Sequence, residues 1–396
     1  MYIMVDAVST AQTTDRKLPN YWLRFVFLIL AAVVCTLGSF AVGRYSLDIA
    51  DVVLVFLSSF CGAIKDLHLL SAYSAFLLLP PPLSLLTAMT LDLSAFFADV
   101  LDLFFSVLPS PDAMAGNVVF DIRAPRIFAA IFVGAALSTA GAAYQGMFQN
   151  PLVSPEILGV SAGAGFGAAL AIYFDLGVGA ITTLAFAGGL IAVGVAYLIS
   201  CLAKGSATLS MVLAGILIGS LFSAATSYIK LVADTNDQLP AITYWLMGSL
   251  ARAEWGYELL FAVTVITIGL IPLCLFRWRM NVLTLGEDEA RSIGVNTNLL
   301  RLIVIVCATL VTAVAVSISG LIGWVGLVIP HFCRMIFGYD YRGIIPAAVV
   351  MGAGFLLLVD DFSRTIAITE VPLGILTAFV GAPIFAYLLM MGERRS

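Results

Sequence analysis

Long apolar runs alternate with short polar breaks along almost the whole chain of 396 residues. Most runs are about 20 residues long, which is the length an α-helix needs to cross roughly 30 Å of hydrocarbon. The short alternating segments of a membrane β-barrel are absent from the sequence. Because a chain in lipid must satisfy its own backbone hydrogen bonds, the pattern predicts an all-α polytopic membrane protein with ten transmembrane helices. The predicted spans are residues 21–43, 127–147, 157–174, 180–202, 207–231, 256–276, 301–319, 322–338, 344–362 and 373–391.

Residues 52–116 depart from this regular pattern. The region is apolar, but three consecutive prolines (Pro80 to Pro82) interrupt it and three aspartates lie in its second apolar run. It forms either two further spans or amphipathic helices that lie on the outer surface. The aspartates favour the surface, because carboxylates are costly within hydrocarbon. We therefore expect an atypical hydrophobic insertion at residues 52–116 on the outer side.

The distribution of lysine and arginine orients the chain. Short cytosolic loops carry an excess of these residues, and this rule places both termini in the cytosol. Residues 1–20 are then a cytosolic segment and residues 21–396 the transmembrane domain. The opposite side is acidic, so Arg123, Arg126 and Arg364 stand against the trend there. The basic residues assigned to the cytosol are Arg16, Lys17, Arg24, Lys204, Arg277, Arg279, Arg291, Arg301, Arg334, Arg342, Arg394 and Arg395.

Composition supports the membrane assignment and limits the chemistry. The chain is 61% hydrophobic and 11% charged, against about 45–50% and 25% in soluble domains. The two histidines, His68 and His331, fall on opposite sides of the predicted membrane, and the six cysteines show no paired spacing. We expect no metal site and no catalytic residues, because no His/Cys cluster and no set of nucleophile and base is present.

The source of energy separates two classes of transporter. The sequence has no GxxxxGK[ST] phosphate loop, so the chain does not bind ATP through that motif. A proton-coupled secondary transporter is the alternative of a different class, and such proteins usually keep ionisable residues inside the membrane. The cores of most predicted spans carry no charge. This favours a transporter whose energy comes from another subunit.

Two further patterns have structural interpretations. Gly159, Gly163 and Gly167 recur every fourth residue, which places small residues on one helix face and favours close helix packing. Residues 277–298 form a charged cytosolic loop, and its apolar positions predict short amphipathic helices.

Four segments, residues 123–167, 285–295, 318–331 and 370–383, resemble the type II ABC importer permeases. That family takes up ferric siderophores, haem, cobalamin and similar complexes. The resemblance implies ten helices per subunit and a dimer of permease subunits, with an identical copy or a paralogue as the partner. It also implies two cytosolic ATPase subunits, an extracytoplasmic binding protein and a location in the cytoplasmic (inner) membrane. Its other implied contacts are membrane lipid and the metal chelate, with no nucleic acid.

The resemblance also assigns roles to particular residues. It implies that outer arginines bind carboxylates of the binding protein, although arginines at an interface also simply extend towards the headgroups. It implies that the loop at 277–298 couples to the ATPase, and that two cytosolic elements form a gate. The residues are Arg123, Arg126 and Arg364 for docking; Leu285, Gly286, Glu287, Glu289, Arg291 and Gly294 for coupling; and Asn150, Leu152, Ser206 and Thr208 for the gate.

The predicted function is therefore the membrane subunit of an ATP-driven importer of an iron complex. Haem, cobalamin and molybdate are alternative cargoes for the same fold. The chain is expected to bind no cofactor itself, since ATP and Mg belong to the ATPase subunits.

Overall fold

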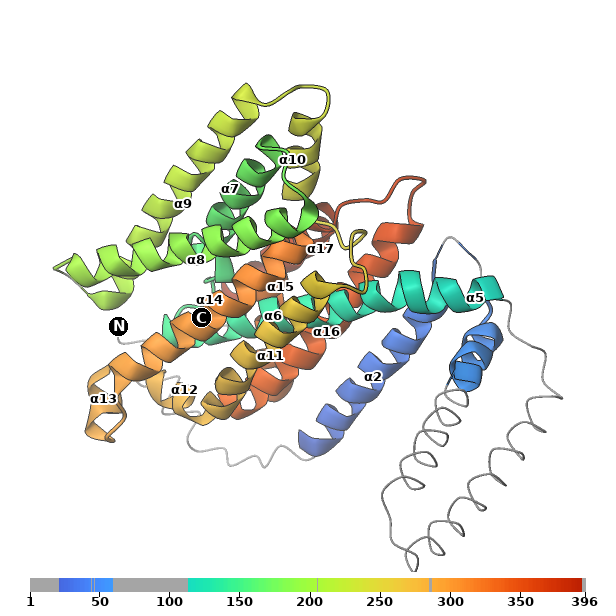
Figure 1. Cartoon of the computed structure of the whole chain (residues 1–396). Helices are drawn as coiled ribbons and strands as arrows, with labels where there is room; N and C mark the ends of the chain where they lie inside the picture. The colour runs from blue at the N-terminus through green and yellow to red at the C-terminus, as the bar shows by residue number, and fades with distance from the viewer. Residues whose placement is uncertain are drawn as a thin grey trace, which may run out of the picture.

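The computed structural model of the protein describes residues 21–43, 45, 47–59, 113–204, 206–284 and 287–393 (Figure 1). The elements of this part of the chain are helices, so the predicted all-α class is confirmed. They are α2 (Tyr21–Ala41), a helix at Ile49–Ser59, α5 (Ala113–Asn117), η1 (Val118–Arg123), α6 (Ala124–Met147), η2 (Pro155–Leu158), α7 (Val160–Tyr173), α8 (Val178–Leu202), α9 (Ala207–Val232), α10 (Gln238–Leu246), α11 (Tyr257–Leu275), α12 (Arg277–Leu283), α13 (Glu287–Ser292), α14 (Thr297–Ser319), α15 (Val325–Phe337), α16 (Tyr341–Thr365) and α17 (Leu373–Glu393).

Each of the ten predicted spans corresponds to a helix of the structure. Seven helical stretches in the described residues are long and apolar enough to cross a membrane. The predicted spans at 157–174, 322–338 and 373–391 correspond to the shorter apolar helices α7, α15 and α17. Helix α15 continues through Pro330.

Helix α6 forms the centre of the bundle, with α11, α14, α15 and α16 around it (Figure 1). Nearly all of its residues are buried, and alanine and glycine dominate its sequence. Such small side chains let neighbouring helices approach closely. Helices α2 and α9 lie at opposite sides of the bundle and keep many apolar side chains exposed, as expected for surfaces that face lipid or a partner.

The start of α6 corrects a predicted boundary. The span expected to begin at residue 127 continues a helical stretch that starts at Met114 and contains a π-helical segment, Val118–Arg123. The N–H of Ala124 bonds to the carbonyl of Val119, five residues back. This wider turn precedes Pro125, which would clash with the carbonyl four residues before it in a regular helix. Arg123 and Arg126 therefore lie inside a helical stretch, whereas the predicted span began after them.

Contacts between distant segments sort into two ends of the bundle. At one end, Arg123 donates to the carbonyl of Phe40, and Trp255 Nε1 donates to the carbonyl of Phe120 at 2.6 Å. At the other end, Gln149 Nε2 donates to the carbonyl of Leu283 at 2.6 Å. The segments at the first end are those predicted to be outside, and those at the second end are those predicted to be cytosolic. We call them the outer end and the cytosolic end.

The insertion predicted at 52–116 falls mostly outside the described residues, which stop at 59 and resume at 113. The helix at Ile49–Ser59 lies at the outer end, where the ring of Phe56 packs between those of Phe40 and Phe120. The choice between two spans and surface helices stays a prediction.

Candidate functional site

The three outer arginines come together at the outer end although they are far apart in sequence. Arg123 is the last residue of η1, Arg126 is in the first turn of α6, and Arg364 is in the last turn of α16. All three are buried, with 3%, 8% and 6% of their surfaces exposed. A buried guanidinium is stable only where its charge and its donors are matched.

Acidic residues of the same chain supply most of those partners. Arg126 binds Asp360 in a bidentate fashion, with Nε to Oδ2 and Nη2 to Oδ1 both at 2.9 Å. Its Nη1 donates to Glu370 Oε1, also at 2.9 Å. Arg364 pairs with Asp361 and lies 3.9 Å from Asp360. We call Arg123, Arg126, Arg364, Asp360, Asp361 and Glu370 the outer ion-pair cluster.

The cluster joins three helices and a loop. Arg364 Nη2 donates to the carbonyl of Ser39 on α2 at 3.0 Å, and Ser39 Oγ donates to Asp361 at 2.6 Å. Arg123 donates to the backbone carbonyls of Phe40 and Tyr45 rather than to a carboxylate. The arginines thus connect α2, α6, α16 and the segment before α17. This structural role accompanies the predicted docking role, which stays a prediction.

The sequence pattern did not identify Asp360 and Glu370 as the partners that hold Arg126. A signal for Asp360 was present, because it is an acidic residue within the apolar span 344–362, and such residues usually have a partner in the bundle. Glu370 lies in a loop, and nothing in the sequence indicated its contact with a residue 244 positions earlier.

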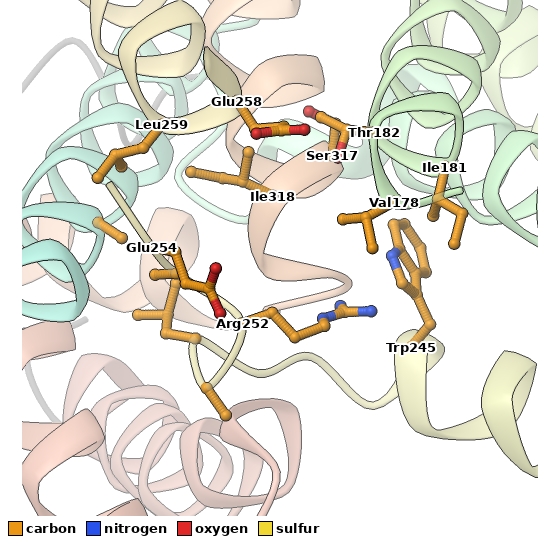
Figure 2. A pocket seen from close by; sticks show the side chains of 14 residues that line it. Val178, Ile181, Thr182, Trp245, Arg252, Glu254, Glu258, Leu259, Ser317 and Ile318 are labelled. Carbon is orange, nitrogen blue, oxygen red and sulfur yellow. The ribbon is translucent and has the colours of Figure 1, made fainter. Parts of the chain in front are cut away.

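A cavity of about 380 Å³ lies at the outer end, with Arg252 and Glu254 in its wall. Figure 2 shows Arg252 extending across it towards Trp245, with Glu254 and Glu258 on other parts of the wall. Arg252 forms no ion pair within the described part of the chain and is exposed. A second cavity of about 560 Å³ shares Trp245 and Arg252 and is also lined by Glu370. The outer end therefore contains two cavities, and the guanidinium of Arg252, unpaired among the described residues, lines both of them.

The predicted gate residues lie in two turns. Asn150 Oδ1 accepts a hydrogen bond from the N–H of Leu152 at 2.9 Å, and both residues are exposed. Ser206 caps α9, its Oγ accepting from the N–H of Leu209 at 3.3 Å. Thr208 follows in the first turn of α9 and is half-buried. The turn at Asn150 follows the end of α6, and α6 starts at the outer end. The turn at Ser206 precedes α9, and the last turn of α9 lies at the outer end. Both turns therefore lie at the cytosolic end. Their gating role stays a prediction.

Two short helices, α12 and α13, occupy the predicted coupling loop, and α13 projects from the bundle (Figure 1). Helix α12 is fixed to the start of α16, because Asn281 Nδ2 donates to Asp340 Oδ1 at 2.6 Å and Asn281 Oδ1 accepts from the N–H of Tyr341. In α13, Glu289 is exposed while Ala290 is buried.

For the other predicted coupling residues, the structure gives the backbone position of three and does not describe the remaining two. Glu287 and Arg291 belong to α13, and Gly294 follows it with a left-handed φ of 85°. Leu285 and Gly286 lie outside the described residues. The structure thus supplies the predicted short helices, whereas the coupling role stays a prediction.

The glycine motif packs helices, but its first member differs from the prediction. A Cβ at Gly163 or Gly167 would lie 2.3 Å or 2.0 Å from a backbone oxygen of α8, so only glycine fits at these contacts. Gly159 precedes α7 and has a φ of 84°. It therefore ends the short helix η2 beside Gly215 of α9 and does not share one helix face with the other two.

No group of three or more His, Cys, Asp or Glu side chains suited to a metal ion occurs in the described residues.

Comparison with known proteins adds relatives to this geometry. Residues 82–391 match the model of the FecCD transport family. The molybdate import system permease protein MolB of Haemophilus influenzae is 40% identical over 283 residues, covering 72% of this chain and 84% of that protein. An iron chelatin transport system permease protein of Helicobacter pylori is 41% identical over 272 residues, covering 69% of this chain and 82% of that protein. A solved structure described as an inward-facing "metal-chelate type ABC transporter" matches with a TM-score of 0.74 and 32% identity, covering 94% of this chain and 100% of that chain.

Proposed function

This chain belongs to the FecCD transport family and is an ABC importer permease, and we propose that it translocates an iron chelate of the ferric-siderophore kind. The observation that carries the choice of cargo is the combined similarity to an iron chelatin permease and to a metal-chelate transporter structure. Molybdate is the second candidate, because MolB is similar to nearly the same degree. The different-class alternative, a proton-coupled transporter, loses its support with the family assignment.

The same proposal includes the partners. Two permease subunits, identical or paralogous, associate in the cytoplasmic membrane, and two ATPase subunits that hold ATP and Mg bind from the cytosol. An extracytoplasmic binding protein delivers the chelate. The absence of a phosphate loop from this sequence supports a separate ATPase. Helix α13 projects from the bundle, and the preceding helix α12 is fixed to the start of α16. This arrangement supports a cytosolic contact between α13 and the ATPase subunit.

Uptake by cells that lack this permease tests the cargo. We expect such cells to lose accumulation of ⁵⁵Fe supplied as a ferric siderophore and to keep accumulation of ⁹⁹Mo-molybdate. Restoring the gene returns iron uptake. Loss of molybdate uptake with normal iron uptake contradicts the iron proposal and establishes the second candidate.

The proposed docking surface is the outer end around the outer ion-pair cluster and Arg252. Four guanidinium groups gather there on a side whose loops are otherwise acidic. Complementary charge fixes the register of two proteins, and an unneutralised charge such as that of Arg252 also guides their encounter. Arg123, Arg126 and Arg364 keep their predicted docking role in this proposal. Because they are buried, little of each side chain is accessible to the binding protein.

Neutralising Arg126 is expected to weaken docking. We expect Arg126→Gln to raise the Kd of the purified binding protein for the assembled transporter in nanodiscs by about thirtyfold, since truncating a buried charge at an interface costs about 2 kcal/mol. Glutamine is preferable to glutamate here, because a carboxylate would face both Asp360 and Glu370. ATP hydrolysis by the assembled complex serves as the check on assembly.

Lys230→Gln provides the matched control for this experiment. Lys230 lies in the last turn of α9 at the outer end and loses the same charge. Equal affinities of the Arg126→Gln and wild-type transporters would contradict docking at Arg126.

A further inference from the structure

Arg126 has two carboxylate partners of very different character. The Asp360 side chain has no exposed surface and receives three hydrogen bonds from Arg126. The Glu370 side chain is 32% exposed and receives one hydrogen bond, through Nη1. Buried pairs are strongly destabilised when one partner is removed, whereas exposed pairs contribute little. Asp360 is thus a permanent partner and Glu370 a replaceable one.

Glu370 also has an unused oxygen. Its Oε2 is buried and has no hydrogen-bond partner among the described residues. Glu370 lines the cavity of about 560 Å³ together with Arg252 and Pro372. A buried carboxylate oxygen without a donor loses solvation and gains no compensating bond. The ion pair between Glu370 and Arg126 therefore carries a desolvation cost. Glu370 contacts the guanidinium of Arg126 and also lines the cavity.

The cluster is neutral while Glu370 is in place. Arg123, Arg126 and Arg364 supply three positive charges, and Asp360, Asp361 and Glu370 supply three negative ones. A carboxylate that approaches from outside meets no net attraction from a neutral cluster. It can bind Arg126 only by taking the position that Glu370 occupies.

We infer that Glu370 is a built-in substitute for a carboxylate of the delivering protein, which displaces it from Arg126 when the two proteins dock. The inference rests on the docking surface proposed above. One ion pair to Nη1 is broken and one is formed, so the exchange leaves the Arg126–Asp360 pair intact. Arg252, free in the wall of the same cavity, offers a second cation beside the exchange position.

The exchange has a mechanical consequence, because Glu370 lies in the segment that joins α16 to α17. That segment is otherwise held by two hydrogen bonds between Ser363 and Val371, at 2.7 and 3.2 Å. The start of α17 is fixed separately, by the N–H of Leu373 to the carbonyl of Gly248 at 2.9 Å. Release of Glu370 removes the side-chain attachment of this segment to α6. Docking would then loosen the link between α6 and α17 at the outer end.

Removing the charge of Glu370 tests the exchange. We expect Glu370→Gln to lower the Kd of the purified binding protein for the nanodisc-embedded transporter by about fivefold, because the competing pair is worth roughly that factor at an exposed site. In a transporter that already carries Arg126→Gln, the same change should leave the Kd unaltered. Such dependence on Arg126 isolates the pairwise effect from a general change in surface charge.

Glu254→Gln is the matched control, since Glu254 is an exposed carboxylate of the outer end with the same charge. It should not reproduce the fivefold effect. Glu370→Ala replaces the glutamine variant if that variant does not assemble. Weakened docking by Arg126→Gln combined with unchanged or weaker docking by Glu370→Gln overturns the exchange and leaves the docking proposal standing. Failure of the wild-type transporter to bind the protein overturns both.

Discussion

Replacement of Asp360 by asparagine is expected to lower the free energy of unfolding of the permease by about 3–5 kcal/mol. Asp360 is completely buried and lies between the guanidinium groups of Arg126 and Arg364. Asparagine keeps the shape of the side chain but removes the negative charge that both arginines share. Two buried cations then repel each other with less compensation, and an uncompensated buried charge is among the largest single-residue penalties.

Thermal unfolding of the purified permease in detergent measures this effect, with the folded fraction followed by size-exclusion chromatography. Glu370→Gln is the control, because it removes an equal charge from the same arginine at a more exposed position. Its cost should stay within about 1 kcal/mol. An Asp360→Asn protein that unfolds at the wild-type temperature would show that the cluster contributes little to stability.

Enlargement of Thr208 to tryptophan is expected to abolish uptake while ATP hydrolysis continues. Thr208 is in the first turn of α9 at the cytosolic end, two residues after the capping residue Ser206. An indole at this position would fill the opening of the proposed gate. The ATPase subunits would still bind and hydrolyse nucleotide, because the change lies outside the coupling helices α12 and α13.

Proteoliposomes that contain the permease and its ATPase subunits allow both quantities to be measured together. The assay follows ⁵⁵Fe-chelate uptake and phosphate release in the presence of the binding protein. Thr208→Val, which keeps the size of the side chain, should transport normally. Undiminished uptake by Thr208→Trp would remove Thr208 from the gate.

Much of the fold follows from local sequence. Each predicted span, from 21–43 to 373–391, corresponds to a helix, because an apolar run in lipid has no other way to satisfy its backbone. Helix ends were harder to predict. The residues before Arg126 continue the helix through a π-helical turn that accommodates Pro125, whereas the predicted span began only at residue 127.

The site was predicted only in part. Charge distribution placed Arg123, Arg126 and Arg364 on the outer side, and the structure brings them together at one end. Their burial and their acidic partners were not predicted. Asp360 and Glu370 contact Arg126 although they are 234 and 244 residues away in sequence. The hydrophobic periodicity of a helix indicates only which of its faces is buried, so it does not predict contacts between such distant residues.

Sequence alone was enough to identify a bundle of membrane helices and the family it resembles, and it predicts how the chain is oriented. These properties depend on hydrophobicity, on lysine and arginine in short loops, and on local motifs, all of which a linear chain displays. The three-dimensional packing was needed to show that the outer arginines are bound within the protein and that the carboxylate of Glu370 is more exposed than those of Asp360 and Asp361. Those properties depend on which side chains meet when α6 packs against α16, and on how much water remains around each of them.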